Sequence, residues 1–472
     1  MLRTTPPSQS RSAARAHDAD IAAAIAAIAD FDRHATRQGE LAIQQARLPR
    51  QLGGLGLTSL ESISDAAYAG SLAGCWHQIH SLVPDLRTIS LTDATDDSDT
   101  DVDSDVGGSD DTDTGHRPLP PSLRECAVGL ALIRSRHDAA SAALQRLRDG
   151  SVQHPTEGEL PLWCPDADLL PALSDLPLLE TMASDDPSNV CAQRKLSQVV
   201  HLCAWHEWFD AAQSGSARDA VRSVQVAQPH AGAPYSALPA YSPIPSRDML
   251  IMLQRRLGLP ISELRNKVGT PFRRRVVHDA HGDAAIAISA EHNHRHNAVL
   301  RCWATAFRAA SRGSRVAVED NRYHTYSPHA RPDITVFDAG GGGLHLLLDV
   351  KVKSTLTSAG APRSPAERGV AFGGVARATR DQVDAKYGGA IANGHTVEPL
   401  LHCTFGGMES AAAARLQLLH DSVRGQLADP ERAPWTARSF LQLHAQRIST
   451  AVQLEAARQV RAAATGGWSA PA

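Results

Sequence analysis

The sequence feature that most constrains the fold is the strongly apolar run LHLLLDVKV at residues 344–352. A short run of leucine and valine of this kind predicts a buried β-strand, and a buried strand needs a sheet around it. Side chains alternate between the two faces of a strand, so Asp349 and Lys351 should share one face while Val350 and Val352 share the other. A carboxylate and an ammonium group are therefore expected side by side on an otherwise apolar strand.

Two further β-prone runs precede this strand, at 315–319 and 333–338, and four glycines at 340–343 supply a flexible turn between the second run and the strand. A hairpin through that turn would bring Asp333, at the start of one strand, beside Asp349 on the next. The sequence thus predicts two carboxylates and one lysine, Lys351, at a single point on a sheet.

This set of side chains suits metal-dependent hydrolysis of a phosphodiester. Two carboxylates can hold a hard divalent cation such as Mg²⁺ or Mn²⁺, which polarises the phosphate and acidifies a bound water. A lysine on the same face can stabilise the developing charge. Asp333, Asp349 and Lys351 match the PD-(D/E)xK pattern of nucleases. The alternative is that Asp349 and Lys351 form a solvated strand face and that Asp333 lies in an ordinary turn.

Composition indicates a mixed α/β protein with a helical N-terminal half. The chain has 472 residues, 42% of them apolar but 4% aromatic, and alanine is abundant, which favours helices. The formal charge is −4, yet ten aspartates lie between Asp93 and Asp113; without them the charge would be +6. The folded parts are thus mildly basic, which is compatible with DNA or RNA as a partner.

Seven dispersed cysteines, with no CxxC pair, favour reduced thiols and an intracellular location. No run approaches the roughly 20 apolar residues of a membrane span, so no membrane association is expected. Oligomeric state cannot be predicted from these features. The acidic, low-complexity residues 91–121 predict a disordered insert.

Several segments together resemble a known family. They are, in chain order, LPRQLGGLGLTSLESISDAAYAGSLAGCW (48–76), RSVQVAQPHAGAPYSALP (222–239), LQRRLGLP (253–260), HNHRHNAVLRCWATAFRAA (292–310), RPDI (331–334), DVKV (349–352), DAKYGGAIANGHTVEPLLHCTFGGM (384–408) and FLQLHAQRISTAVQLEAARQVR (440–461). The series resembles the C-terminal portion of non-LTR retrotransposon polyproteins, in which a restriction-like endonuclease follows a reverse transcriptase. The resemblance implies an α/β domain of the restriction-endonuclease type and a nuclear location.

The resemblance also implies a domain order and site roles. The expected parts are a helical segment like the region after the polymerase thumb (1–90), the acidic insert (91–121), a helical region (122–227), a Pro-rich linker with a degenerate zinc-knuckle-like segment (228–290), the nuclease domain (291–428) and C-terminal helices (429–472). Asp333 and Asp349 would be metal ligands, with Glu319 close by. Lys351 and Lys386 would be catalytic, and Arg295, His296 and Arg331 would contact nucleic acid. Glu319 as a surface strand residue, and Lys386 as a solvated charge beside a core Tyr387, remain alternatives.

Two departures from the family matter. The reverse transcriptase palm is not recognised in the chain, so no copying of nucleic acid is expected. The zinc-knuckle positions lack cysteine, with Ala284 and Ile288 where ligands would stand, so zinc is not expected. Three hypotheses follow: a DNA-nicking endonuclease, a catalytically inactive nucleic-acid-binding remnant, and a fragment with no molecular function.

Overall fold

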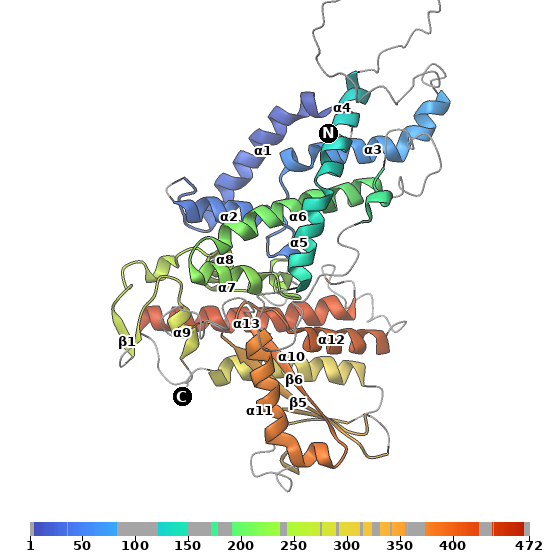
Figure 1. Ribbon diagram of the computed structural model, residues 1–472. Helices are drawn as coiled ribbons and strands as arrows, with labels where there is room; N and C mark the ends of the chain where they lie inside the picture. The colour runs from blue at the N-terminus through green and yellow to red at the C-terminus, as the bar shows by residue number, and fades with distance from the viewer. Residues whose placement is uncertain are drawn as a thin grey trace, which may run out of the picture. The chain divides into compact units, whose positions relative to one another are not determined.

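The computed structural model describes residues 4–34, 36–82, 121–149, 171–177, 191–236, 243–273, 276–288, 292–311, 315–322, 331–339, 342–354, 356, 373–423, 437 and 439–466. The protein is a mixed α/β protein, mostly helical with a small sheet (Figure 1), which confirms the predicted fold class at that level. Two compact units are distinguished: Met1–Ile21 with Thr58–Gln145 and Asp166–His206, and Ala22–Leu57 with Arg146–Pro165 and Glu207–Ala472. The acidic insert predicted at 91–121 lies, except for its last residue, outside the described residues.

The first half of the chain is helical where it is described, as predicted. Its α-helices are α1 (Pro7–Ile28), α2 (Arg37–Arg47), α3 (Leu60–Leu82), α4 (Pro121–Ser135), α5 (His137–Asp149), α6 (Ala192–Gln213) and α7 (Ala217–Val226). In the first unit, the Asp18 carboxylate accepts hydrogen bonds from the Ser59 hydroxyl, at 2.5 Å, and from the Leu60 backbone N–H, at 2.9 Å. These bonds satisfy donors at the start of α3 and attach α1 to it.

The apolar spacing of residues 18–47, at intervals of three and four, predicts one helix there, and this prediction is wrong as a single element. The chain leaves the helix after Ile28, and Asp30 takes a left-handed conformation with φ of 53°. Thr36 then begins α2 by accepting a hydrogen bond from the Gly39 N–H. A left-handed aspartate and a threonine N-cap are both stronger helix boundaries than the continuing alanine-rich composition.

The second unit contains a four-stranded sheet in the order β3-β4-β5-β6. Its strands are β3 (Val316–Val318), β4 (Ile334–Val336), β5 (Leu346–Lys353) and β6 (Thr396–Cys403). The pairs β3–β4 and β4–β5 are antiparallel and β5–β6 is parallel. The sequence predicts strands at 315–319, 333–338, 344–352 and 398–404, and all four are confirmed within a few residues of these bounds.

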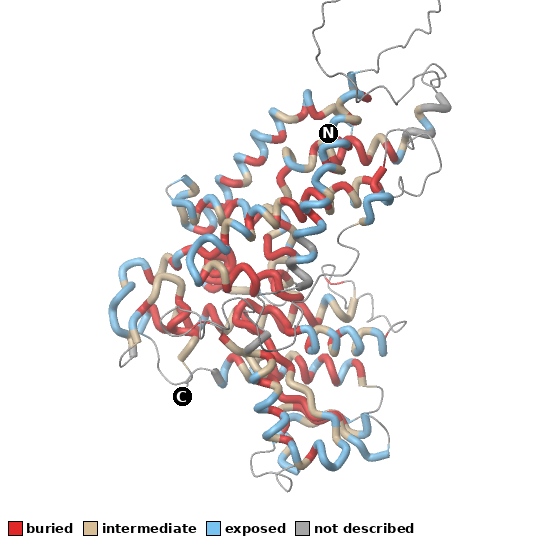
Figure 2. Tube along the Cα trace, in the orientation of Figure 1, coloured by how far each residue is buried: buried red, intermediate tan, exposed pale blue. Residues whose placement is uncertain are grey.

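Helices cover this sheet (Figure 1). α10 (His292–Ala310), α12 (Ser410–Ser422) and α13 (Phe440–Thr465) share one apolar cluster with strand side chains that include Ile334, Leu348 and Leu400. α11 (Gly373–Ala392) joins β5 to β6 and packs against Leu347 through a second cluster. The sequence predicts helices at 292–311, 374–393 and 409–427, and the resemblance implies another at 440–461. The first two and the last are confirmed, whereas the helix at 409–427 ends at Ser422, and 424–427 lie outside the described residues. Figure 2 shows burial concentrated along α13 and the strands.

The many prolines of residues 228–246 predict an extended connector, and this prediction is wrong in its first part. Residues 228–236 form turns and a short 3₁₀ helix, Ala233–Tyr235. The Tyr235 hydroxyl donates to the Met252 carbonyl of α8 (Ser246–Leu257), 2.9 Å away, and the guanidinium of Arg256 lies over the Tyr235 ring. Packing against α8 and α13 overrides the proline-rich composition, whereas 237–242 lie outside the described residues.

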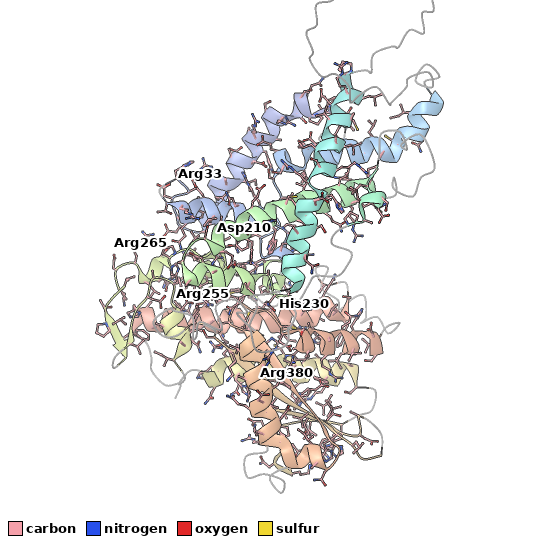
Figure 3. All side chains as sticks on the ribbon, viewed as in Figure 1. Arg33, Asp210, His230, Arg255, Arg265 and Arg380 are labelled. Atoms are coloured by element: carbon pink, nitrogen blue, oxygen red, sulfur yellow. The ribbon has the colours of Figure 1, made fainter. Side chains whose placement is uncertain are left out.

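The segment that resembles a degenerate zinc knuckle forms a small ββα unit. β1 (Pro271–Arg273) pairs with β2 (Val276–Val277), and the short helix α9 (Asp283–Ala287) follows. Asp283 is buried and accepts from the Arg218 guanidinium at 2.6 Å, with Arg255, labelled in Figure 3, close to its second oxygen. Ala285 and Ile286 pack on α8 and α13. Apolar packing and a buried ion pair therefore attach this unit to the helices around it.

Candidate functional site: a carboxylate pair on the central hairpin

The two predicted acids lie opposite each other on the β4–β5 hairpin. The register pairs Ile334 with Leu348 in an antiparallel ladder, so the next positions along are Asp333 and Asp349. Directly opposed residues of an antiparallel pair point to the same face. Leu348 and Val350 face the α10–α13 cluster, which leaves Asp349 on the α11 face. The predicted alternation of the strand LHLLLDVKV is therefore confirmed.

Asp333 is held by contacts from two other elements. Its Oδ2 accepts a hydrogen bond from the backbone N–H of Val350 at 2.6 Å, and its Oδ1 lies 3.4 Å from Nε2 of His296 on α10. Burial alone would raise the pKa of Asp333, but the hydrogen bond and charge of His296, together with Lys351, outweigh burial and lower it. Asp333 is thus a carboxylate at neutral pH.

Asp349 is 1% exposed and is contacted by two lysines. Nζ of Lys351 lies 2.7 Å from Oδ2, an ion pair whose angle does not meet hydrogen-bond geometry, and Nζ of Lys386 lies 3.3 Å from Oδ1. A carboxylate this deeply buried would be strongly destabilising without such counter-charges. Asp349 and the two lysines therefore form a charge cluster around a buried carboxylate, at the end of the β4–β5 hairpin away from its turn.

Tyr387 of α11 completes the cluster. Its hydroxyl donates to the backbone carbonyl of Arg331 at 2.8 Å and lies 3.4 Å from Oδ1 of Asp349. Burial and the negative charge of Asp349 raise the pKa of Tyr387, so its hydroxyl remains a donor throughout the physiological range. The sequence indicated Tyr387 as a core aromatic, and it is 1% exposed; its polar role depends on how α11 packs on the sheet, which no local sequence signal encodes.

His296 also belongs to the site. Its side chain is 26% exposed. The hydrogen bond to Asp333 raises the pKa of His296, whereas burial and the charge of Lys351 act in the opposite direction. The structure thus brings together five of the side chains that the sequence analysis named as site residues: Asp333, Asp349, Lys351, Lys386 and His296.

One predicted residue points elsewhere. Arg295 was expected to contact nucleic acid, but it is 1% exposed and donates to Oε1 of Gln459 on α13 at 2.9 Å, so it offers no surface to a phosphate. That expectation is corrected. Glu319 was expected close to the metal; its backbone N–H donates to the Asp333 carbonyl at 3.0 Å, which places it beside the site, and its carboxylate pairs with Arg331 at 2.5 Å. The Arg331 guanidinium, 47% exposed, is accessible to a phosphate but is engaged by this pair.

The donor set suits a hard divalent cation. Asp333 and Asp349 supply carboxylate oxygens, and Oδ2 of Asp349 is a buried oxygen with no hydrogen bond, contacted by an ammonium group alone. Within the described parts of the chain, no group of three histidine, cysteine or acidic side chains is arranged to hold a metal ion. Any further ligands for a cation here would be backbone oxygens or water, which Mg²⁺ in particular retains.

No helix among the described residues is long and apolar enough to cross a membrane. Comparison of the chain with protein-family models and with curated proteins gave no match in either case.

Proposed function

We propose that this chain derives from a retrotransposon open reading frame and that residues 291–428 form a restriction-endonuclease-like domain that nicks DNA with Mg²⁺ or Mn²⁺. DNA is the expected partner, with RNA as a second nucleic-acid ligand, and the nucleus the expected location. Reverse transcription is not part of the proposal.

The observation that carries this proposal is that Asp333 and Asp349 lie opposite each other on a hairpin, with Lys351 and Lys386 in contact with Asp349. Metal-dependent phosphodiester hydrolysis needs this combination: oxygen ligands for a cation and a positive group for the developing negative charge. The order of sequence segments described above supports the same domain type.

The residues have distinct roles in the proposed reaction. Asp333 and Asp349 would hold the cation, which when bound supplies Lewis-acid polarisation of the phosphate and a more acidic water. Lys351 stands beside Asp349, where its ammonium can stabilise negative charge on the phosphate. The oxygen of a water molecule bonds to phosphorus, and the bond between phosphorus and one of its two sugar oxygens breaks. The proton of the water passes to that sugar oxygen, which becomes a hydroxyl group. The products are one phosphate and one hydroxyl end.

The charges of the cluster favour an anionic substrate once a cation is present. Two carboxylates are balanced by two ammonium groups, with His296 as a further group that can become positive. Adding a divalent cation makes the cluster strongly positive, which attracts a phosphodiester. The cluster thus couples cation binding to nucleic-acid binding.

A plasmid-nicking assay tests the proposal. Supercoiled DNA is incubated with the full chain and Mg²⁺ or Mn²⁺, and the wild type is compared with Asp349→Ala. The wild type is expected to produce open circles in a metal-dependent manner and Asp349→Ala to be at least about 100-fold slower. Equal activity of the two proteins, or none in either, defeats it.

One observation favours the second candidate, a binding remnant that does not cut. Asp349 is almost fully buried and both of its oxygens are occupied by lysines, so a cation must displace at least one of them. In that case the chain would show salt-dependent DNA binding with no metal-dependent cleavage, and Asp349→Ala would leave the affinity for DNA unchanged or higher.

A further inference from the structure

Two consecutive side chains of α11 contact the same two oxygens. The Tyr387 hydroxyl lies 2.8 Å from the Arg331 carbonyl oxygen and 3.4 Å from Oδ1 of Asp349, and Nζ of Lys386 lies 3.5 Å and 3.3 Å from the same two atoms. A single ammonium group therefore lies between a buried carboxylate oxygen and a backbone carbonyl oxygen. Both are oxygen types that hard divalent cations coordinate.

Three features hold the carbonyl oxygen of Arg331 in place. Pro332 follows Arg331 and restricts it to an extended conformation. The Arg331 guanidinium pairs with Glu319 at 2.5 Å, and the Tyr387 hydroxyl donates to the carbonyl itself. Glu319 thus acts on the site by positioning Arg331.

The ammonium of Lys386 is held less tightly than the carbonyl. Its contacts of 3.3 Å and 3.5 Å exceed the roughly 2.7–2.9 Å of a strong charge-assisted hydrogen bond. Its side chain is 28% exposed, so the flexible stem can turn toward solvent. A singly charged group on such a stem can be displaced by a doubly charged ion.

We propose that the Lys386 ammonium occupies, in the cation-free protein, the position that a divalent cation takes, and that the Arg331 carbonyl oxygen is a ligand of that cation beside Asp349. The proposal rests on the proposed function for its choice of cation. The Arg331 carbonyl oxygen would be a third oxygen ligand, in addition to the two carboxylates that the described side chains offer. Cation binding then releases Lys386 toward the face where a phosphate would lie, so that the positive charge reaches the substrate only when the cation is in place.

Removal of the Lys386 charge should therefore strengthen cation binding while weakening catalysis. Mn²⁺ binding to the full-length protein is measured by isothermal titration calorimetry, with Asp349→Asn as the baseline that subtracts ions bound by other acidic residues. Lys386→Met, which keeps the stem and removes the charge, is expected to bind Mn²⁺ about tenfold more tightly than the wild type. Nicking by the same variant is expected to fall.

Two control variants separate the local charge from other effects. Lys386→Arg keeps the charge and should bind Mn²⁺ no more tightly than the wild type. Lys353→Met removes one charge four residues beyond Asp349 on β5 and should leave Mn²⁺ affinity within about twofold, because the charge of this half-buried lysine lies about 13 Å along the strand, beyond one screening length of roughly 8–10 Å. Thermal melts show that each variant is folded, and Lys386→Gln replaces Lys386→Met if the latter does not fold.

The outcomes are separable. Mn²⁺ affinity in Lys386→Met that equals or falls below the wild-type value overturns the inference, even if the wild type nicks DNA. Tighter Mn²⁺ binding in Lys386→Met without nicking by the wild type supports the inference and defeats the nuclease function. If neither wild type nor Lys386→Met binds Mn²⁺ beyond the Asp349→Asn baseline, the inference fails as well.

Discussion

The carboxylate of Asp333 accepts a hydrogen bond from the backbone N–H of Val350, with Oδ2 2.6 Å from that nitrogen. Val350 follows Asp349 on β5, so this bond connects Asp333, the residue before β4, to the part of β5 that carries the second acid. The contact fixes one oxygen of Asp333 and leaves Oδ1 on the side of His296. The pair is thus positioned by backbone as well as by side chains, which is the precision that a cation site needs.

Replacing Tyr387 with phenylalanine should destabilise the protein by about 1 kcal/mol. The change removes the hydroxyl that donates to the Arg331 carbonyl and leaves that acceptor with only the longer contact to the Lys386 ammonium at 3.5 Å, while the ring continues to pack on Val383. Urea unfolding of wild type and variant measures the difference. Identical midpoints and slopes would mean that the hydroxyl contributes nothing at this position.

Replacing His296 with glutamine should reduce stability at acid pH and not at alkaline pH. The pKa of His296 is raised in the folded protein, so its contribution is fully present below its ordinary value near 6.5 and is lost as pH rises through the folded pKa. The partly exposed pair should contribute about 0.5 kcal/mol. Unfolding midpoints of both proteins at pH 5.5 and 8.5 measure this difference. A difference that is the same at both pH values, or larger at 8.5, contradicts the assignment.

His402 should make the folded protein sensitive to acid. Burial lowers its pKa to about 3, and its Nε2 accepts a hydrogen bond from the Trp303 indole at 2.8 Å. Between pH values near its ordinary pKa of 6.5 and about 3, the unfolded chain binds a proton that the folded one does not. The free energy of unfolding therefore decreases as the pH is lowered through this range, by up to about 1.4 kcal/mol per pH unit. His402→Gln keeps an acceptor but cannot titrate, and its stability should fall less steeply. Parallel curves for the two proteins would contradict the expected role.

Replacing Asp283 with alanine should cost about 3 kcal/mol, because it removes the carboxylate that pairs with two buried guanidinium groups, Arg218 at 2.6 Å and Arg255 at 3.7 Å. The double variant Arg218→Met with Asp283→Leu replaces the closer pair by apolar groups and should recover only part of that loss, because the buried charge of Arg255 still lacks Asp283. Urea unfolding of the wild type, the single variant and the double variant measures both effects. A single variant as stable as wild type would show that this ion pair does not hold the ββα unit in place.

The sequence predicted the site hairpin well because local rules determine it. The alternation of β5 after Leu348 places Asp349 and Lys351 on one face irrespective of what packs against them. Glycines between β4 and β5 leave the turn free to form, and the hairpin then sets Asp333 opposite Asp349. The presence of the acid pair is therefore a consequence of spacing, whereas the nuclease function stays a prediction.

Other features depend on residues far apart in the chain. Arg295 is buried because Gln459, more than 150 residues later, accepts its hydrogen bond, and nothing near Arg295 signals this. The packing of 228–236 depends in the same way on α8 and α13. The contacts of Lys386 and Tyr387 with Asp349 depend on how α11 crosses β5, which is set by apolar burial across the whole helix. Local periodicity predicts elements and faces but not these long-range partners.

Crystals of the full-length protein soaked in Mn²⁺ and measured for anomalous scattering test the central claim most directly. The account predicts one strong anomalous peak within coordination distance of both the Asp333 and Asp349 carboxylates, absent from crystals of Asp349→Asn. A map with no peak between these two acids, or with peaks at other acidic residues alone, would contradict it.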